Sequence, residues 1–129
     1  MVLKIISAGQ TGIDRMGREV ALELGFQIGG EADSLANQIR QNVTDADATV
    51  LYGDPESPGA KAILEYCLQA NKPYSLNPIP DDLTTFIRDN GVQVLNVTGN
   101  HGGKIIPEFL DAYRSAFRQA LLPFSEKSD

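Results

Sequence analysis

The sequence Ser7-Ala8-Gly9-Gln10-Thr11-Gly12-Ile13-Asp14-Arg15 is the most informative stretch of the chain, because it is expected to join a strand to a helix through a tight glycine turn. The preceding run, Val2-Leu3-Lys4-Ile5-Ile6, consists mostly of β-branched residues and leucine, and it predicts a short buried strand. Apolar residues recur at helical spacing from Ile13 to Leu24, and Gly25 stands where helices commonly end. A strand, a Gly-x-x-Gly turn and a helix start together predict an anion site, since unpaired backbone N–H groups point out of a helix start.

The side chains around this turn fit the same interpretation. Within Gly9-Gln10-Thr11-Gly12, the two glycines let the backbone approach a ligand closely, and Thr11 adds a hydroxyl donor. Arg15 works against the helix macrodipole at this end, so a bound anion would explain its presence, whereas Asp14 suits a helix start in any case. A plain sharp turn is the alternative interpretation, because one Gly-x-x-Gly tetrad is weak evidence.

The composition predicts one globular domain without a basic surface. The 129 residues suffice for one core, and 42% hydrophobic and 22% charged residues are typical of globular proteins. We expect a single ligand-binding domain over residues 1–124 and a flexible tail over 125–129. A net charge of −6 argues against general nucleic-acid binding and against binding to an anionic membrane. With no signal peptide, no transmembrane run and a lone Cys67, we expect a cytoplasmic protein without disulfides.

Strand-like and helix-like segments alternate five times along the chain, which predicts an α/β three-layer sandwich with a mostly parallel sheet of about five strands. Strands are expected over 2–6, 26–30, 48–52, 73–76 and 92–97. Helices are expected over 13–24, after a cap at 33–34, over 59–70, from 80 to 90 and from 107 onward.

Three polar, glycine-rich loops each follow a predicted strand, over residues 7–12, 53–59 and 98–104. Loops that follow parallel strands lie at the same edge of a sheet, where α/β proteins bind their ligands. The first loop and the helix start contribute Gly9, Gln10, Thr11, Gly12, Asp14 and Arg15 as candidate ligand-binding residues. The second and third loops contribute Gly53, Ser57, Gly59, Thr98, Gly99, Asn100, His101 and Lys104. Ser57 followed by Pro58 is also a typical helix cap and first-turn pair.

The remaining polar candidates carry weaker signals. His101 is either a solvent-exposed loop residue or a contact for a bound anion, and Lys104 allows the same two interpretations. No second His or Cys and no carboxylate cluster accompanies His101, so we expect no metal site. Asp45 and Asp47 precede a predicted strand at its amino end, away from the ligand edge, and we interpret them as turn and cap residues.

The chain resembles the molybdenum-cofactor carrier family, which consists of circularly permuted Rossmann-like relatives of the nucleotide-binding SLOG superfamily. The most specific match is residues 5–15 against the family pattern I-I-S-G-G-Q-T-G-x-D-R. Residues 42–49 are similar to N-V-x-D-S-D-x-T, residues 57–59 to the family's second glycine loop, and residues 95–100 to L-N-V-A-G-x. The resemblance implies a Rossmann-like fold, a homo-oligomer (a tetramer or a dimer), and the molybdenum cofactor or a nucleotide as the ligand.

The chain departs from the family's pattern at three points. Ala8 replaces a glycine, which narrows the room for a close approach of the backbone. Ala60 stands where relatives usually carry threonine, which removes a hydroxyl group suited to a phosphate. Only residues 31–41 separate the pair Gly29-Gly30 from Asn42, so a long polar insertion of the family is absent.

These observations favour a binding or carrier protein for a phosphorylated, nucleotide-like small molecule. The alternative is a nucleotide-processing enzyme such as an N-glycosidic phosphoribohydrolase, by analogy with SLOG relatives, with Glu65 or Asp14 as the candidate catalytic carboxylate. A further alternative is a structural oligomer with a vestigial site, because the segment after Gly30 is short. The last helix also supports self-association, because it carries more apolar surface than one contact with the sheet would bury. The apolar residues are Phe109, Tyr113, Phe117, Leu121, Leu122 and Phe124.

Overall fold

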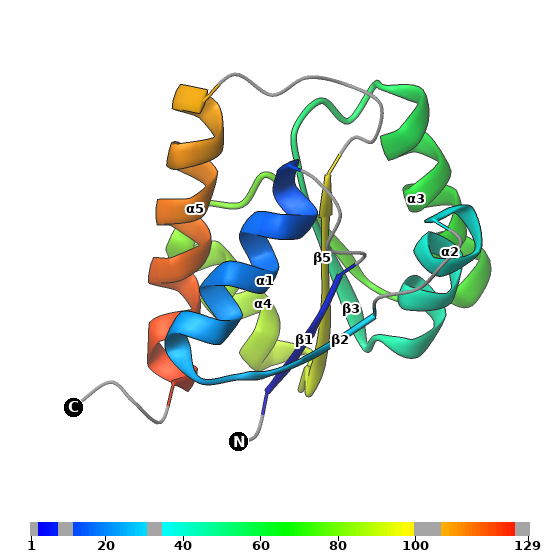
Figure 1. Ribbon diagram of the computed structural model, residues 1–129. Helices are drawn as coiled ribbons and strands as arrows, with labels where there is room; N and C mark the ends of the chain where they lie inside the picture. Colours follow the sequence, from blue (N-terminus) through cyan, green and yellow to red (C-terminus); the bar gives the residue numbers. More distant parts are fainter. Residues whose placement is uncertain (1–2, 8–11, 31–34, 100–106, 126–129) are drawn as a thin grey trace.

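The computed structural model describes residues 3–7, 12–30, 35–99 and 107–125, and in these residues a five-stranded parallel sheet lies between two layers of helices (Figure 1). The strands are β1 (Lys4–Ile6), β2 (Gln27–Gly29), β3 (Ala48–Tyr52), β4 (Tyr74–Leu76) and β5 (Val94–Gly99). The helices are α1 (Gly12–Leu24), α2 (Leu35–Asp45), α3 (Pro58–Ala70), α4 (Pro80–Asp89) and α5 (Pro107–Leu121), followed by a 3-10 turn at Leu122–Phe124. The predicted α/β class and the parallel sheet are confirmed.

The strand order is β2-β1-β5-β3-β4, and all neighbouring pairs are parallel. Strand β5 starts two residues later than predicted and includes Thr98 and Gly99, which the sequence analysis assigned to a loop. The delay has a local cause, because the N–H of Val92 donates to the Ile87 carbonyl at 3.0 Å and closes the end of α4. Gly99 then pairs with Tyr52 at the far end of the β5–β3 ladder.

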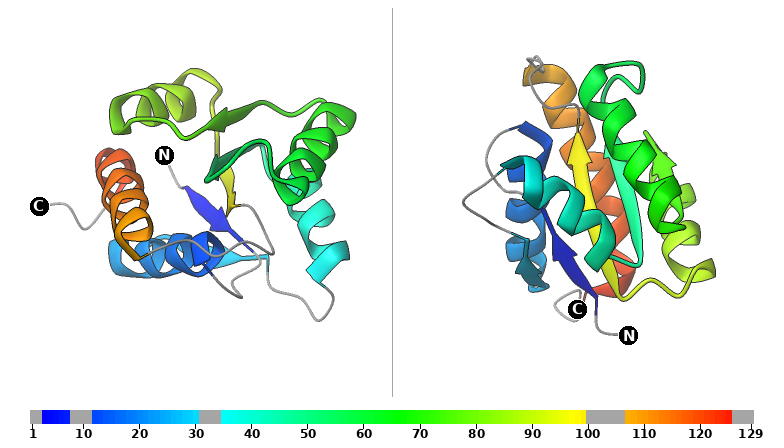
Figure 2. Two further views of the ribbon diagram at one scale, coloured as in Figure 1. Left: turned by 90° about the horizontal axis from the view of Figure 1, so that it is seen from above. Right: turned by 90° about the vertical axis from the view of Figure 1, so that its right-hand side faces the viewer.

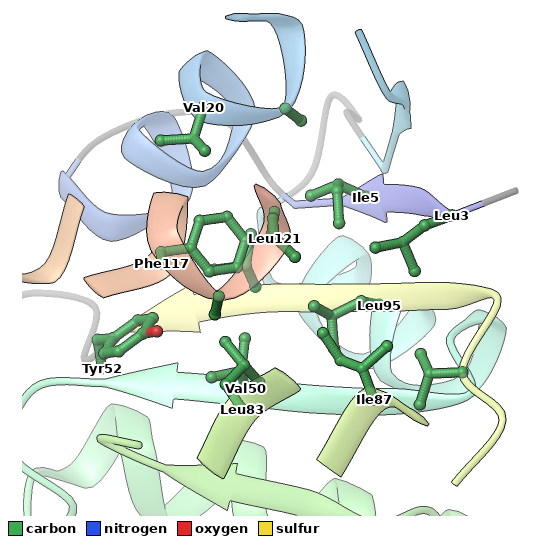
Figure 3. Packing of buried hydrophobic residues seen from close by; sticks show 14 of the residues in the cluster. Leu3, Ile5, Val20, Val50, Tyr52, Leu83, Ile87, Leu95, Phe117 and Leu121 are labelled. Carbon is green, nitrogen blue, oxygen red and sulfur yellow. The ribbon is translucent and has the colours of Figure 1, made fainter. Parts of the chain in front are cut away.

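The helices divide between the two faces of the sheet, as Figure 2 shows. The larger core cluster lies under α1, α4 and α5, and Figure 3 shows Tyr52 and Phe117 near one end of it. The smaller cluster lies under α2 and α3 and contains Val43, Leu51, Ala60, Ile63 and Cys67. Alternate residues of β3 face opposite layers, so Val50 joins the larger cluster and Leu51 the smaller one.

Helix α1 lies close to the sheet through one face of small and apolar residues. All six residues predicted for this face are buried: Ile13, Met16, Gly17, Val20, Ala21 and Leu24. A Cβ atom added at Gly17 would lie 2.1 Å from Cγ1 of Val97, so only a glycine allows this approach of α1 to β5. The helix ends at Gly25 (φ 83°), where the N–H of Phe26 donates to the Ala21 carbonyl at 2.9 Å, as predicted from the glycine.

Two large apolar side chains, one on α5 and one on α3, are exposed. Phe109 of α5 is 58% exposed and Leu68 of α3 is 63% exposed. Each lies beside the buried stripe of its helix, and only the stripe reaches the sheet. The other apolar residues of the last helix and turn are buried or pack against the larger cluster, so the surplus apolar surface expected there is mostly used within the chain.

The chain remains packed through Ser125, one residue into the predicted tail. Ser125 is buried, and its hydroxyl group donates to the Leu24 carbonyl at 2.8 Å. Residues 126–129 lie outside the described part of the chain. None of the helices built from described residues has the length and apolar character that a membrane span requires.

The cap role predicted for Asp47 is confirmed at the amino edge of the sheet. Its carboxylate accepts hydrogen bonds from the N–H groups of Gln93 and Val94, both at 2.9 Å, and its own N–H donates to the Val94 carbonyl at 2.8 Å. Asp45, also exposed, accepts a hydrogen bond from the Gln41 amide at 2.7 Å. Both carboxylates therefore serve the local structure.

Candidate functional site

The strand order creates a switch point at the carboxyl edge of the sheet. Neighbouring strands β5 and β3 are followed by helices on opposite faces, because α5 packs on the larger cluster and α3 on the smaller one. Chains that leave adjacent strands toward opposite faces open a crevice between them, and α/β proteins bind ligands there. Tyr52 and Gly99 are the paired residues at this point. Strand β1 lies on the other side of β5, so the start of α1 borders the same edge.

Asp14 is the buried carboxyl group of this edge. Its residue is 1% exposed, and its main-chain carbonyl accepts a hydrogen bond from the Ser7 hydroxyl group at 2.9 Å. Burial raises the pKa of the Asp14 carboxyl group from its ordinary value of 3.8 to about 7, and interaction with the Thr98 side chain offsets part of that increase. Thr98 is itself 4% exposed on β5, so the pair joins α1 to the central strand.

Glycines bring the backbone segments of this edge together. Gly12 begins α1 with φ 56°, a backbone conformation that favours glycine. A Cβ atom at Gly99 would lie 2.6 Å from Cγ1 of Ile13 and 3.0 Å from the Tyr52 carbonyl oxygen. The start of α1 and the ends of β5 and β3 are therefore in direct contact, with no room for a larger residue at Gly99.

Tyr52 places an aromatic ring and a hydroxyl group beneath the edge. Its ring packs on Tyr113 at a centroid distance of 5.2 Å. It also packs edge-on against Phe117, at a centroid distance of 6.1 Å, and Figure 3 shows the rings of Tyr52 and Phe117. Burial raises the pKa of Tyr52 above its ordinary value. Among the residues that the structure describes, no hydrogen-bond partner reaches its buried hydroxyl oxygen. In the sequence, Tyr52 carries no signal beyond its place in a predicted strand.

The second loop is shaped by its own polar groups. Gly53 has φ 120°, and its N–H and carbonyl both bond to the side-chain amide of Asn77, each at 2.8 Å. The Ser57 hydroxyl group donates to the Asp54 carbonyl at 2.9 Å and accepts from the Ala60 N–H at 3.2 Å. Ser57 thus caps α3 as predicted, and Gly59 lies in the first turn of that helix.

Asn77 is a positioning residue for which no role was predicted from the sequence. Its φ of 44° is a left-handed conformation, which asparagine tolerates better than most residues. An asparagine directly after a short strand and before a proline was the available signal.

Buried polar side chains also line the sheet on the α2 side. Asn42 is 2% exposed and its amide donates to the Gly30 carbonyl at 3.2 Å, while the Asn96 amide donates to the Thr49 hydroxyl oxygen at 3.3 Å. Gly30 has φ 90°, and a Cβ atom there would lie 2.9 Å from the Asn42 amide. Asn42 and Asn96 belong to segments quoted for the family resemblance, but no role was predicted for them.

The structure brings together only part of the predicted set. Gly12, Asp14, Gly53, Thr98 and Gly99 meet at the switch point described above. Arg15 is exposed in the first turn of α1. The remaining candidates of the first and third loops lie outside the described residues: Gly9, Gln10, Thr11, Asn100, His101 and Lys104.

Glu65 does not lie among these residues. It is an exposed residue in the middle of α3, and its carboxylate accepts a hydrogen bond from the Gln69 amide at 3.4 Å. A hollow of about 200 Å³ lies between α2 and α3, lined by Arg40, Thr44, Tyr66, Gln69 and Ala70. There the Arg40 guanidinium group lies over the Tyr66 ring, 5.8 Å from its centroid. None of the residues that line this hollow was predicted to be a site residue. Within the described ranges, no three His, Cys, Asp or Glu side chains are grouped to hold a metal ion.

Comparison with known proteins gives one solved structure. No protein-family model and no curated protein matches this chain. The fold is similar to the crystal structure of the "Putative molybdenum carrier protein" from Syntrophus aciditrophicus, with a TM-score of 0.77 and 24% sequence identity. The superposition covers 93% of this chain and 95% of that chain. The resemblance drawn from the glycine-rich segments is therefore confirmed at the level of the fold.

Proposed function

We propose that this chain binds a small anionic, nucleotide-like molecule at the carboxyl edge of its sheet and acts as a binding or carrier protein. The observation that carries the proposal is the strand order, which makes β1, β5 and β3 neighbours. Those are the three strands that glycine-rich segments follow, so all three segments begin at one edge of the sheet, at a switch point. The similarity in fold to a protein named as a molybdenum carrier supports a carrier role.

The start of α1 would hold the charged part of the ligand. The first turn of α1 presents the positive end of the helix dipole, and Arg15 adds an exposed positive charge. The net charge of −6 opposes any anion, so the ligand needs apolar or ring contacts as well as a phosphate. A nucleotide meets both needs. A molybdenum cofactor also meets them, and this site would hold it through the organic part of the cofactor.

A nucleotide-processing enzyme is the second candidate, and the burial of Asp14 favours it. A carboxyl group with a pKa of about 7 at a ligand edge can donate or accept a proton near neutral pH. Glu65, the other candidate carboxylate, is exposed on α3. Incubation with nucleoside monophosphates followed by product analysis separates the two functions, since a carrier returns the nucleotide unchanged.

Replacing Arg15 tests the anion site. We expect Arg15→Ala to weaken the binding of phosphate or of a mononucleotide by about 1–3 kcal/mol, as is typical when a hydrogen bond to a charged group is lost. Calorimetric titration measures the change. Arg88→Ala removes one positive charge in the last turn of α4 and should leave the affinity unchanged.

Crystals soaked in phosphate, sulfate and a mononucleotide locate the ligand. An anion at the N–H groups that begin α1 supports the proposal. Soaked crystals in which this turn is open to solvent and holds no anion contradict it, and the chain is then better described as a structural oligomer with a vestigial site.

For self-association, we propose the β4 edge rather than α5 as the contact surface. Strand β4 is an edge strand, and four of the large exposed apolar side chains lie on it or in the neighbouring segments: Leu68, Tyr74, Leu76 and Ile79. An unpaired strand edge with apolar neighbours is suited to a second copy of the chain.

The variant Ile79→Asp tests this surface. Ile79 is 62% exposed and occupies the cap position of α4 without a side-chain cap bond, so an aspartate there supplies a cap and should not harm folding. We expect sedimentation to show a smaller species for this variant than for the wild type. Leu22→Asp changes an equally apolar residue, 54% exposed on α1, and should sediment like the wild type. A wild-type chain that sediments as a monomer would exclude the proposal.

A further inference from the structure

Asp14 shares a helix end with the anion proposed above, so the inference that follows rests on the proposed function. Asp14 is the third residue of α1, and side chains of a helix tilt toward its N-terminus. Its carboxyl group is therefore directed toward the first turn, where the positive end of the helix dipole is found. With the residue 1% exposed between α1 and β5, water does not screen this carboxyl group from a neighbouring charge.

Among the described residues around Asp14, few positively charged groups can interact with its carboxyl group or with a bound anion. At this end, Ser7, which follows β1, and Thr98 on β5 are neutral, and β2 carries no charged residue. The titratable or charged groups on the elements packed against α1, and on α1 itself, are the following: Lys4 on β1, Tyr52 on β3, Arg15 and Arg18 on α1, and Glu108, Asp111 and Tyr113 on α5. Further along, Glu19 pairs with Arg114 and Glu23 with Arg118, both at 2.9 Å.

We infer that Asp14 makes anion binding at this site depend on a proton, so that a doubly charged anion binds only when the Asp14 carboxyl group is neutral. An ionised Asp14 and a bound anion would place like charges at one helix end, in an environment of low dielectric. Two charges about 6 Å apart at an effective dielectric constant of about 20 repel enough to change an equilibrium roughly 100-fold. Asp14 is thus a specificity-determining residue for the charge state of the ligand.

Asp14 titrates in the pH range near neutrality, where this dependence affects binding. Its pKa of about 7, raised by burial, leaves the carboxyl group neutral in part of the molecules at neutral pH. By linkage, an anion that prefers the neutral form raises this pKa further and takes up a proton when it binds. Affinity should therefore fall as pH rises above the pKa of the free protein.

Sulfate and molybdate are suitable probes, because both remain dianions between about pH 6.5 and pH 9 and do not titrate themselves. For the wild type we expect the affinity for each to fall by about tenfold per pH unit above about pH 7. Asp14→Asn keeps the size of the side chain and is neutral at every pH, so its affinity should be high and independent of pH. Asp89→Asn removes an exposed carboxylate from the last turn of α4 and should follow the wild type.

Calorimetry in two buffers of different ionisation enthalpy supplies a second readout. We expect uptake of up to about one proton per anion by the wild type near pH 8 and none by Asp14→Asn. Binding that is independent of pH in the wild type, without proton uptake, would overturn the role of Asp14 and leave the anion site intact. If neither probe binds the wild type or Asp14→Asn at any pH, the proposed anion site itself fails, and this inference with it.

Discussion

Asp14→Asn should stabilise the protein at neutral and alkaline pH, which is unusual for the replacement of a buried side chain. The pKa of Asp14 in the folded protein is about 7 and its ordinary value is 3.8. Between these values the folded state holds more protons than the unfolded state, so the free energy of unfolding falls as pH rises through that window. The loss is complete above about pH 7 and amounts to about 4 kcal/mol for this difference in pKa.

The asparagine side chain carries no charge to desolvate and can still accept a hydrogen bond from Thr98. Urea unfolding of both proteins should show a gain for Asp14→Asn that grows from about 2 kcal/mol at about pH 5.5 to about 4 kcal/mol at about pH 8.5. Asp111→Asn, at an exposed position of α5, is the matched loss of one carboxylate and should show no such growth. A variant that is less stable than the wild type at alkaline pH would mean that Asp14 is ionised and stabilising in the folded protein.

Gly17→Ala should destabilise the chain and disturb the site, although alanine is the better helix former. The added Cβ atom would lie 2.1 Å from Cγ1 of Val97, and both the Cβ and Cγ2 atoms of Val97 lie 3.1 Å away. Valine has a stiff χ1 angle and this one is fully buried, so the side chain cannot rotate away. Overpacking costs about 1–3 kcal/mol, against a helix-propensity gain of about 1 kcal/mol, and α1 must move outward.

Val97→Ala provides the compensating change, because it removes both methyl groups that the new Cβ atom would meet. We expect the double variant to be more stable than the sum of the single changes predicts, with a coupling of at least about 1 kcal/mol. Urea unfolding of the four proteins measures the cycle. Strict additivity would mean that α1 does not rest on Val97. Because the same approach of α1 to β5 brings Asp14 to Thr98, Gly17→Ala should also weaken sulfate binding, and the double variant should recover part of it.

Most of the elements could be predicted because their signals are local. The end of α1 at Gly25 and the cap of α3 at Ser57 depend on residues a few positions apart, and both were predicted. The buried face of α1 followed from apolar spacing alone. The start of β5 was missed, since Val92 reads as a strand residue but its N–H closes helix α4. Val92 therefore belongs to the end of a helix, although its residue type is typical of a strand.

Alternation and periodicity are properties of neighbouring residues, so the sequence alone predicts the parallel α/β sheet and the common edge at which the three strands before the glycine-rich segments end. Three features became visible only in the folded chain: Tyr52 pairs with Gly99, Asn77 holds Gly53, and Asp14 is buried while Arg15 is exposed. These facts depend on which surfaces meet across distant parts of the chain. Asp14 and Arg15 are adjacent in one helix turn, and the sequence does not distinguish which of the two is buried. The strand packed beside the helix determines which side chain is removed from water.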